Sequence, residues 1–302
     1  MESRSRDRAG DVQDVVAMRL PGYRVHSVVL LGEGQDNIAY EVNGELIVRF
    51  SKEPDPAVRA AQVRDEAGLL AAVADISPLP VPAPSFTVAE EGCLAYFKLP
   101  GTPLIDLPAS RRSADTANTA AIAATLGELL NALHGVPIGR MAELVDTDDQ
   151  PKELWLREAA ETYAMVAGQV PPVYRHAVEA FLDAPPPADG HALAFSHNDL
   201  GIEHVLVDPA GRAVTGVIDW SDAAIVDPAY DFGLIHRDLG PLAVRAALSR
   251  YRTGAHEAEA ISARAAFYAR CSVFEDMAYG IDTGHGSYLT KSLTALRWLF
   301  PA

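Results

Sequence analysis

Cysteine is scarce in this chain, and its two cysteines, Cys93 and Cys271, lie far apart in the sequence. Neither stands in a CxxC pair or beside a cluster of cysteine and histidine, so the pattern argues against a zinc site and against a disulfide framework. Isolated cysteines of this kind behave as small buried apolar side chains. Because disulfides are rare in reducing compartments, we expect a cytoplasmic protein.

Long apolar runs are also lacking. No stretch approaches the roughly 18 consecutive apolar residues that read as a membrane-spanning helix. The basic N-terminus, residues 1–10, is not followed by an apolar core or by a small-residue cleavage site. We therefore expect neither a signal peptide nor a membrane partner.

Positive charge is in short supply: 25 lysines and arginines face 41 acidic residues, which gives a formal net charge of −16. A field of this sign repels nucleic acid and anionic lipid and attracts cations, so we expect no nucleic-acid partner. With 49% hydrophobic and 22% charged residues among 302, the chain has the composition of a globular protein. It is long enough for one large domain or two lobes. No obligate protein partner is indicated.

The N-terminal third begins with a helical pattern and then changes to β patterning. Residues 11–20 place their valines and Leu20 on one helical face. Alternation then predicts strands at residues 23–31, 38–42, 45–50, 84–89 and 93–99. Asn43-Gly44, between two of these runs, is a strong hairpin signal. Residues 56–74 are predicted to form a helix with proline at its start.

Helical periodicity dominates after residue 103. Helices are predicted at residues 114–134, 151–168, 171–183, 241–252, 256–281 and 287–299. A β-rich island, residues 192–219, interrupts them with two short strands, at residues 204–207 and 213–218. The pattern predicts an α+β protein of two lobes. A small antiparallel β-sheet lobe with one main helix covers residues 1–99, and a larger, mainly helical lobe covers residues 100–302.

Acidic residues and histidine gather in and after this island. Residues 195–208 read FSHNDLGIEHVLVD, residues 216–220 read GVIDW and residues 227–232 read DPAYDF. Phosphoryl transfer needs a carboxylate that orients the attacking hydroxyl and accepts its proton, and further ligands that hold Mg²⁺ on the phosphates. One short loop carries Asp199 and His204, and Asp219 ends the next apolar strand. The three side chains can therefore meet at one place.

This order of motifs resembles the catalytic loop and metal site of the protein-kinase-like phosphotransferases. His-x-Asp is followed, five residues after the aspartate, by a metal ligand, and Ile-Asp-Trp resembles their DFG-type site. Within that superfamily the chain is most similar to the aminoglycoside and macrolide phosphotransferases, over nearly its whole length. The combination is specific, because three acidic elements follow in the required order behind a β-rich lobe. The resemblance implies a bilobal, protein-kinase-like fold.

The resemblance implies roles for the residues of these motifs. Asp199 corresponds to the catalytic base, and Asp219 corresponds to the Mg²⁺-binding aspartate. His197 would orient the catalytic loop, and Asp231 would support its backbone from the start of a following helix. His204 stands where many family members have asparagine, and histidine at this position is familiar from the 2″-aminoglycoside and macrolide enzymes. His204 is therefore expected either to bind the metal or to brace the loop.

The resemblance places the phosphate donor, ATP or GTP, against the N-terminal lobe. In the loop of residues 32–37, backbone N–H groups of Gly32, Gly34 and Asn37 are expected to meet phosphate oxygens. The hinge between the lobes would follow the fifth strand. There, backbone groups of Phe97 and Leu99 are expected to bond the purine edge.

Kinases also need a cation on the third strand that holds the phosphates and pairs with a helix glutamate. Arg49 stands where the family normally has lysine, and Glu66 is its expected partner on the following helix. Arginine can hold phosphate bidentately, although with a different reach from lysine. Lys52 is a weaker candidate for the same role.

The acceptor is expected over the C-terminal lobe, as a small-molecule antibiotic whose phosphorylation would confer resistance. The residues chosen to line its site are Asp238, Glu275, Asp276, Trp155 and Glu158. A polycationic aminoglycoside would need several carboxylates around it, and the negative field of the protein would steer it there. The alternatives are a macrolide phosphotransferase or another small-metabolite kinase of this fold, and a binding module without turnover.

Overall fold

The computed structural model describes residues 2–34, 37–108, 116–188 and 190–301. The chain forms two compact units. The first consists of Met1–Asp75 and Pro80–Leu99, and the second of Ile76–Leu79 and Pro100–Ala302. In the part of the chain that the structure describes, no helix is both long enough and apolar enough to cross a membrane.

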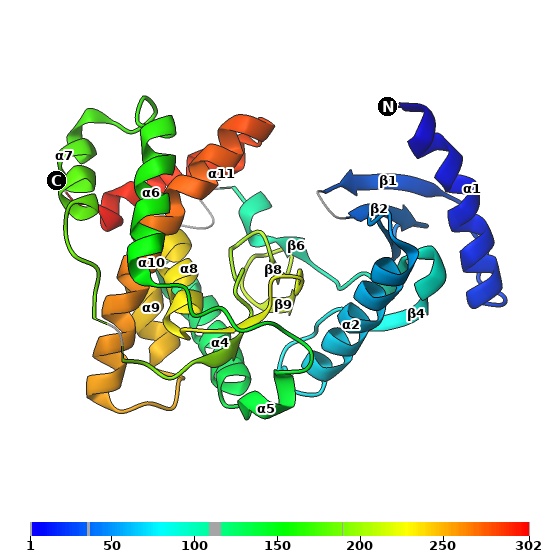
Figure 1. Cartoon of the computed structure of the whole chain (residues 1–302), viewed down its shortest axis with the longest axis horizontal. Coiled ribbons are helices and arrows are strands. Elements are labelled where there is room, and N and C mark those ends of the chain that lie inside the picture. The colour runs from blue at the N-terminus through cyan, green and yellow to red at the C-terminus, as the bar shows by residue number, and fades with distance from the viewer. Residues whose placement is uncertain (1, 35–36, 109–115, 189, 302) are drawn as a thin grey trace. The chain divides into compact units, whose positions relative to one another are not determined.

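Five antiparallel strands form the sheet of the first unit (Figure 1). They are β1 (Val28–Glu33), β2 (Asn37–Val42), β3 (Leu46–Ser51), β4 (Pro84–Val88) and β5 (Cys93–Phe97), in the spatial order β1-β2-β3-β5-β4. The predicted five-stranded antiparallel sheet is thereby confirmed. The first strand begins later than predicted, at Val28 instead of Tyr23.

The hairpin between β2 and β3 explains why the segment before β1 is not a strand. Asn43 and Gly44 have φ values of 53° and 76°, the left-handed conformation that a two-residue I′ turn requires at both positions. The Asn43 side chain accepts hydrogen bonds from the backbone amides of His26 and Ser27, at 2.7 and 3.1 Å, and donates to the carbonyl of Arg24 at 2.8 Å. These hydrogen bonds satisfy backbone groups of Arg24, His26 and Ser27 in place of the pairing that a β-strand would provide.

Two helices, α1 (Glu2–Arg19) and α2 (Pro56–Ala74), complete the first unit. Asp55 caps α2 by accepting hydrogen bonds from the backbone amides of Ala57 and Val58. A cap of this kind is worth about 1 kcal/mol. Three valines of α1 join the buried core formed by β2, β3, β4 and β5: Val12, Val15 and Val16. The helix predicted at residues 11–20 is confirmed as part of a longer one.

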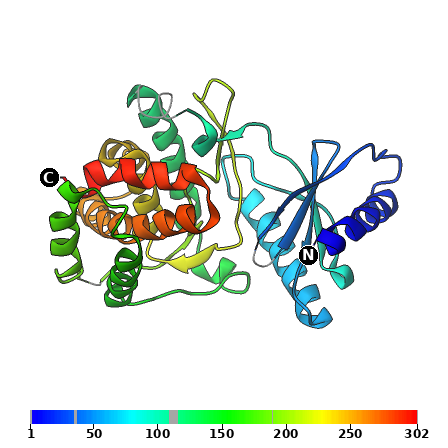
Figure 2. The same ribbon diagram turned by 90° about the horizontal axis from the view of Figure 1, so that it is seen from above.

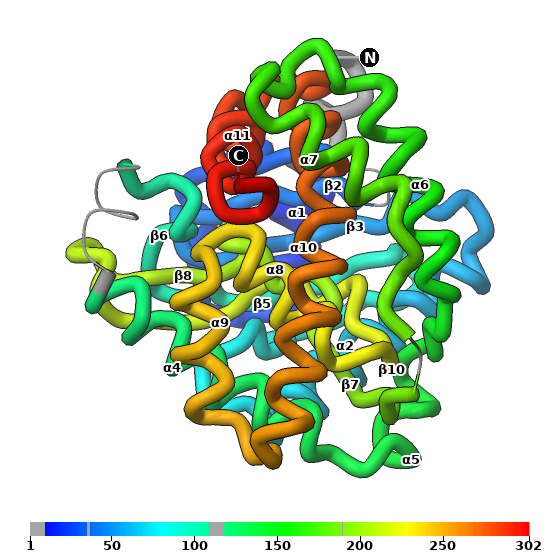
Figure 3. Tube along the Cα trace, turned by 90° about the vertical axis from the view of Figure 1, so that its left-hand side faces the viewer, coloured from blue at the N-terminus to red at the C-terminus, as the bar shows by residue number. Residues whose placement is uncertain are grey.

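The second unit is mainly helical. Its helices are α4 (Thr116–His134), α5 (Ile138–Met141), α6 (Lys152–Val166), α7 (Pro172–Leu182), α8 (Ala229–Leu239), α9 (Pro241–Leu248), α10 (Ala255–Thr283) and α11 (Gly286–Leu299). α10 packs against α6, α8 and α11, and Figure 2 shows α10 and α11 side by side. In Figure 3, α9 lies beside α4.

Short strands in the second unit hold the loop that carries the motifs. β8 (Val205–Val207) pairs with β9 (Val214–Val217) and with β6 (Thr102–Pro103), and β7 (Ala194–Ser196) pairs with β10 (Ala224–Val226). The two strands predicted in the β-rich island correspond to β8 and β9. β6, β7 and β10, which are two or three residues long, were not predicted.

Candidate active site

Asp231 anchors the loop that follows β7. This aspartate lies in the first turn of α8 and is fully buried. Its two carboxylate oxygens accept hydrogen bonds from the backbone amides of His197, at 3.1 Å, and Asn198, at 2.9 Å. Asn198 adopts a φ of 63°, a conformation that asparagine tolerates better than most residues. The chain therefore turns sharply just before Asp199, and the expected support of this loop by Asp231 is confirmed.

His197 is completely buried under the same loop. Its Nδ1 accepts a hydrogen bond from the backbone amide of Asp199 at 3.2 Å, so its ring proton is on Nε2, which donates to the carbonyl of Ile218 at 3.1 Å. Burial lowers the pKa of His197 to about 4, which keeps the ring neutral at neutral pH. His197 therefore ties the backbone at Asp199 to the residue that precedes Asp219.

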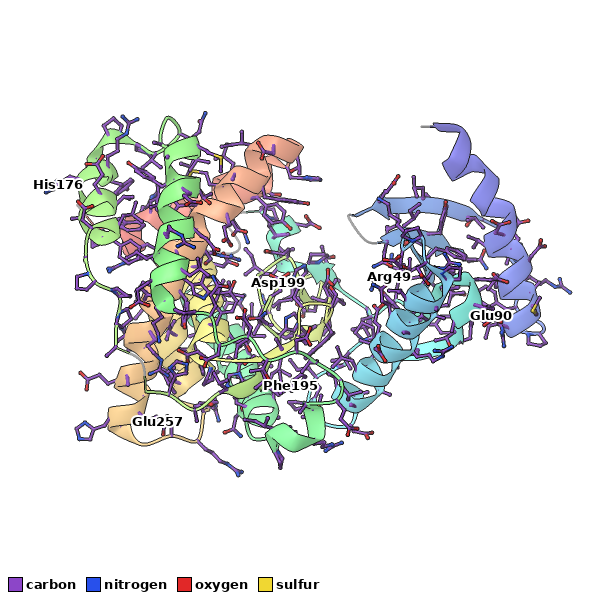
Figure 4. All side chains as sticks on the ribbon, in the orientation of Figure 1. Arg49, Glu90, His176, Phe195, Asp199 and Glu257 are labelled. Atoms are coloured by element: carbon purple, nitrogen blue, oxygen red, sulfur yellow. The ribbon has the colours of Figure 1, made fainter. Side chains whose placement is uncertain are left out.

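The side chains of Asp199, His204 and Asp219 lie together at this loop, where Figure 4 labels Asp199. Nδ1 of His204 is 2.8 Å from the backbone carbonyl of Asp199 and 3.2 Å from its Oδ2. Nε2 of His204 is 3.6 Å from Oδ2 of Asp219. The hydroxyl of Ser221 donates to the other oxygen of Asp219 at 2.8 Å. The imidazole thus stands between two carboxylates.

The electrostatics of this group favour a carboxylate that can hold a proton. Burial raises the pKa of Asp199 to about 6, and the charge of Glu203 adds to the rise while His204 opposes it. Burial alone would lower the pKa of His204, but the surrounding carboxylates, Asp199 and Asp219 first, raise it overall. A base with a pKa near neutrality is suited to accept a proton from a reacting hydroxyl.

The ligand atoms of His204 and Asp219 fit a magnesium ion that takes most of its ligands from phosphates and water. A carbonyl oxygen only accepts, so the contact with Asp199 places the proton of a neutral His204 on Nδ1 and leaves a lone pair on Nε2. That lone pair faces the Asp219 carboxylate, an arrangement that a proton or a cation between them would stabilise. Among the described residues, no group of three or more His, Cys, Asp or Glu side chains could hold a metal. Mg²⁺ commonly uses one or two carboxylates together with phosphates and water.

In the first unit, Arg49 on β3 pairs with Glu66 on α2. Nη1 of Arg49 is 2.6 Å from Oε1 of Glu66, and the two side chains are 17% and 22% exposed. The predicted ion pair is confirmed. Figure 4 labels Arg49 in the sheet region of this unit. Lys52 instead donates to the carbonyl of Gly34 at 2.9 Å and lies 3.1 Å from the carboxylate of Glu33.

The two glycines of the predicted phosphate loop lie at the end of β1: Gly32 is within the strand and Gly34 follows it. The amide of Gly34 donates to the carbonyl of Asn37 at 2.9 Å, and residues 35–36 of the predicted phosphate loop lie outside the described residues. A Cβ built on Gly32 would meet no atom within 4 Å. The space where a side chain would stand at Gly32 is therefore open, and contact between Gly32 and phosphate stays a prediction.

Phe97 and Leu99 lie at and just beyond the end of β5. The Phe97 ring is 45% exposed and packs edge-on against Tyr23 with centroids 6.2 Å apart. Between the two residues, the amide of Lys98 donates to the carbonyl of Glu45 at 2.8 Å. Their contact with a purine stays a prediction.

The acidic residues predicted to bind the acceptor separate into two groups. Asp238 and Asp276 are buried and face cations of the protein itself. The carboxylate of Asp238 lies 2.8 Å from Nε of Arg237 and 3.3 Å from Nζ of Lys291. These two cations hold the pKa of Asp238 well below its usual range, although burial opposes the shift. In this arrangement neither Asp238 nor Asp276 is placed to meet an ammonium group, because both carboxylates are already paired.

The second group, Glu158, Glu275 and Trp155, is accessible. Glu275 on α10 is exposed, and Glu158 and Trp155 on α6 are half-buried. Partial desolvation raises the pKa of Glu275, with the charges of Asp276, Glu158 and Asp199 contributing and that of Arg237 opposing. The carboxylate of Glu275 therefore interacts electrostatically with Asp199 of the catalytic loop and with Glu158.

A pocket of about 320 Å³ opens beside these residues within the second unit. Its wall includes Trp155, Tyr230 and Tyr268, whose ring centroids are 4.9–5.5 Å apart. Asp148, Asp149 and Asn198 also line it. Sequence reasoning did not select these aspartates or Tyr230, although the acidic run at residues 146–149 was a signal that could have found them.

The family model described as the phosphotransferase enzyme family matches residues 27–268. A curated relative, the uncharacterized protein YcbJ of Bacillus subtilis (strain 168), is 48% identical over 44 residues. That match spans 15% of this chain and 14% of the relative.

Solved structures of similar fold include antibiotic phosphotransferases. A GDP complex of aminoglycoside 2′-phosphotransferase-IIIa has a TM-score of 0.68 and 22% identity, with 95% of this chain and 96% of that chain covered. A macrolide 2′-phosphotransferase, MphH from Brachybacterium faecium, has a TM-score of 0.62 and 22% identity, with 95% and 97% covered. These likenesses confirm the predicted kinase-like fold. Because the family model covers most of the sequence, the chain belongs to the phosphotransferase enzyme family.

Proposed function

We propose that this enzyme transfers the γ-phosphoryl group of ATP or GTP to a hydroxyl of an aminoglycoside, and thereby confers resistance. The observation that carries the proposal is the placement of Asp199, His204 and Asp219 around one loop. His204 stands 3.2 Å from the first carboxylate and 3.6 Å from the second. Such a group offers a base for the acceptor and ligands for the metal that accompanies the donor.

Asp199 is the proposed base. Its carboxylate would accept a hydrogen bond from the acceptor hydroxyl and orient the oxygen toward the γ-phosphorus. As the new P–O bond forms, the bond between the γ-phosphorus and the β,γ-bridging oxygen breaks, and the nucleoside diphosphate leaves. The hydroxyl proton passes to Asp199 late in the reaction. His197 is a positioning residue, because it touches backbone on both sides of this group but does not face the substrate.

Asp219 and His204 would hold Mg²⁺. When bound, the ion would offset the charge of the phosphate oxygens. Arg49 is proposed to hold the phosphates of the donor, since its guanidinium presents a planar pair of N–H donors that matches phosphate geometry. Its 2.6 Å ion pair with Glu66 would fix the direction of that side chain.

Charge and accessibility favour an aminoglycoside as the acceptor. The exposed Glu275, the half-buried Glu158 and the aspartates of the nearby pocket offer several carboxylates to a polycation. The formal net charge of −16 would also attract it over long range. A macrolide would instead need an extended apolar groove for its large ring.

We expect a 4,6-linked aminoglycoside to bind with an affinity that falls as salt rises. Exposed ammonium–carboxylate contacts are screened over a Debye length of about 8 Å at physiological ionic strength. Isothermal titration at low and high salt, with one aminoglycoside and one macrolide, measures this. Glu158→Gln and Glu275→Gln should reduce the salt dependence, and Glu128→Gln, an exposed acidic change on α4, serves as their control.

A macrolide phosphotransferase is the alternative, because one of the similar structures has that activity in its name. Affinity based on apolar burial changes little with modest salt. Tight, salt-insensitive macrolide binding without aminoglycoside binding would replace the proposed acceptor. It would leave the roles of Asp199 and Asp219 unaffected.

His204→Asn is expected to reduce turnover by roughly tenfold or less, because asparagine is the more common residue at this position among similar enzymes and its carbonyl oxygen suits Mg²⁺. The dependence of rate on Mg²⁺ concentration should shift while folding is retained. Steady-state kinetics across a magnesium titration checks this. A loss as complete as that of an Asp219 variant would show that the imidazole has a role which asparagine cannot supply.

A further inference from the structure

Five charged side chains form a buried cluster directly behind the catalytic loop. They are Glu203 of the loop, Arg237 and Asp238 of α8, Asp276 of α10 and Lys291 of α11, and none of their side chains is more than 12% exposed. Three carboxylates thus share two cations in the protein interior. The chemistry proposed above requires none of these groups to touch a substrate.

Lys291 lies at the centre of this cluster. Its Nζ is 2.6 Å from Glu203, 2.9 Å from Asp276 and 3.3 Å from Asp238. The ammonium donates hydrogen bonds to Glu203 and Asp238, and its contact with Asp276 is an ion pair without a hydrogen bond. Arg237 makes a parallel set of contacts, with Nε 2.8 Å from Asp238 and 3.0 Å from Asp276.

The cluster holds two consecutive residues of the loop. Asp238 accepts a hydrogen bond from the backbone amide of Ile202 at 3.1 Å, and Lys291 holds the side chain of the next residue, Glu203. A Cβ at Gly201 would collide with the Glu203 carboxylate, so the absence of a side chain at Gly201 is what allows Glu203 to fold back. The residue after this clamped pair is His204.

A buried ion cluster is a poor way to gain stability, because an apolar core of the same shape is commonly as stable or more so. What such a cluster supplies is a defined geometry, since each charge must keep its hydrogen-bonding partners. The geometry it defines here is that of the segment leading into His204. One member of the cluster, Lys291, belongs to α11, which begins more than 80 residues after the loop.

We propose that Lys291 and Glu203 are positioning residues of the phosphoryl-transfer site. By holding Glu203 from α11, Lys291 fixes the start of β8 and with it the imidazole that stands between Asp199 and Asp219. The C-terminal helix thereby becomes part of the catalytic apparatus without touching a substrate. This inference rests on the function proposed above.

The test compares Lys291→Met, Glu203→Gln and the double variant. Each single change is expected to lower kcat by roughly tenfold and to raise the Mg²⁺ concentration that turnover needs, because the displaced His204 is a proposed metal ligand. KM for the acceptor should stay within about twofold, because Glu158 and Glu275 are not altered. The double variant should be no slower than Lys291→Met alone, since both changes remove the same tie. Lys291→Arg keeps the charge and should retain most of the turnover.

Arg250→Met is the matched control, because it removes a cation from an ion pair with Glu128 in which both side chains are more than half exposed. It should leave kcat unchanged. Glu203→Gln preserves shape and removes one excess negative charge, so it is expected to fold even where Lys291→Met does not. A normal kcat in Glu203→Gln, or fully additive losses in the double variant, would overturn the proposal.

Hydrogen exchange separates this inference from the proposed function. In Lys291→Met, amide exchange should accelerate in residues 200–206 and remain unchanged in β2 and β3 of the first unit. Uniform exchange across the chain, or no change near the loop, would contradict a positioning role even if turnover fell. Wild-type protein that phosphorylates neither drug class would overturn the proposed acceptor, and the exchange result would still decide the role of Lys291.

Discussion

Asp199→Asn is expected to lower turnover by about two orders of magnitude or more, as the loss of a positioned base does. Asparagine has nearly the same shape, and the hydrogen bond from Nδ1 of His204 is kept because its acceptor is the backbone carbonyl of residue 199. Burial raises the pKa of Asp199, so its charged form is disfavoured in the folded protein, and the melting temperature should not fall when that charge is removed. Nucleotide affinity should change little, because this carboxylate is assigned to the acceptor hydroxyl.

Three measurements on purified protein check this expectation: kcat at saturating substrates, nucleotide affinity by titration, and the melting temperature. Asp208→Asn is the matched control, since Asp208 lies half-buried in the turn between β8 and β9 and accepts hydrogen bonds from backbone amides. That variant should keep normal turnover. If Asp199→Asn retained turnover near that of the wild type, Asp199 would not be the base.

The parts of the fold that sequence reasoning predicted well are those with local causes. The helix at Pro56–Ala74 has the predicted bounds, because a capping aspartate and a proline fix its start and apolar spacing sustains it. The hairpin at Asn43-Gly44 likewise follows from two residues that tolerate positive φ. The catalytic motif could be recognised in the sequence because Asp199 and His204 occur on one short segment. The pairing of β8 with β9 then brings Asp219 next to them.

The parts that escaped prediction depend on contacts between distant segments. Nothing near Asp238 in the sequence distinguishes a solvated aspartate from a buried one, and one of its partners, Lys291, is 53 residues away. The range of α8 was also not predicted, and its buried residues include the charged Asp231 and Arg237, which a sequence pattern does not assign to a core. Burial of charge is a property of packing, which a local pattern does not contain.

The same limit applies to the choice of acceptor residues. The sequence predicts five acidic or aromatic positions on the helices that follow Pro151 and Asp231, and packing separates them into two groups. Glu158, Glu275 and Trp155 remain accessible. Asp238 and Asp276 are instead paired with Lys291 inside the protein. The composition of the chain indicates that an acidic surface exists, but only the fold shows which carboxylates belong to it.

Asp219→Ala is expected to abolish the part of nucleotide affinity that depends on Mg²⁺. Asp219 has a φ of 63°, and a left-handed conformation costs an alanine roughly 1–2 kcal/mol. The alanine variant therefore combines lost charge with backbone strain and should melt at a lower temperature. Asp219→Asn keeps the shape and tolerates this conformation better, so it isolates the loss of the charged ligand.

Titration of ATP and of GTP, each with Mg²⁺ and with a chelator, measures the effect. Wild-type protein should bind more tightly when Mg²⁺ is present, whereas both Asp219 variants should bind with the same low affinity in the two conditions. Asp183→Ala, an exposed change at the end of α7, should behave as the wild type. A magnesium effect of normal size in Asp219→Asn would assign the metal to other ligands. Ser221 and His204 approach the Asp219 carboxylate at 2.8 and 3.6 Å. Without this carboxylate, His204 is the one proposed protein ligand that remains, and a single ligand is too few to hold the ion on the phosphates.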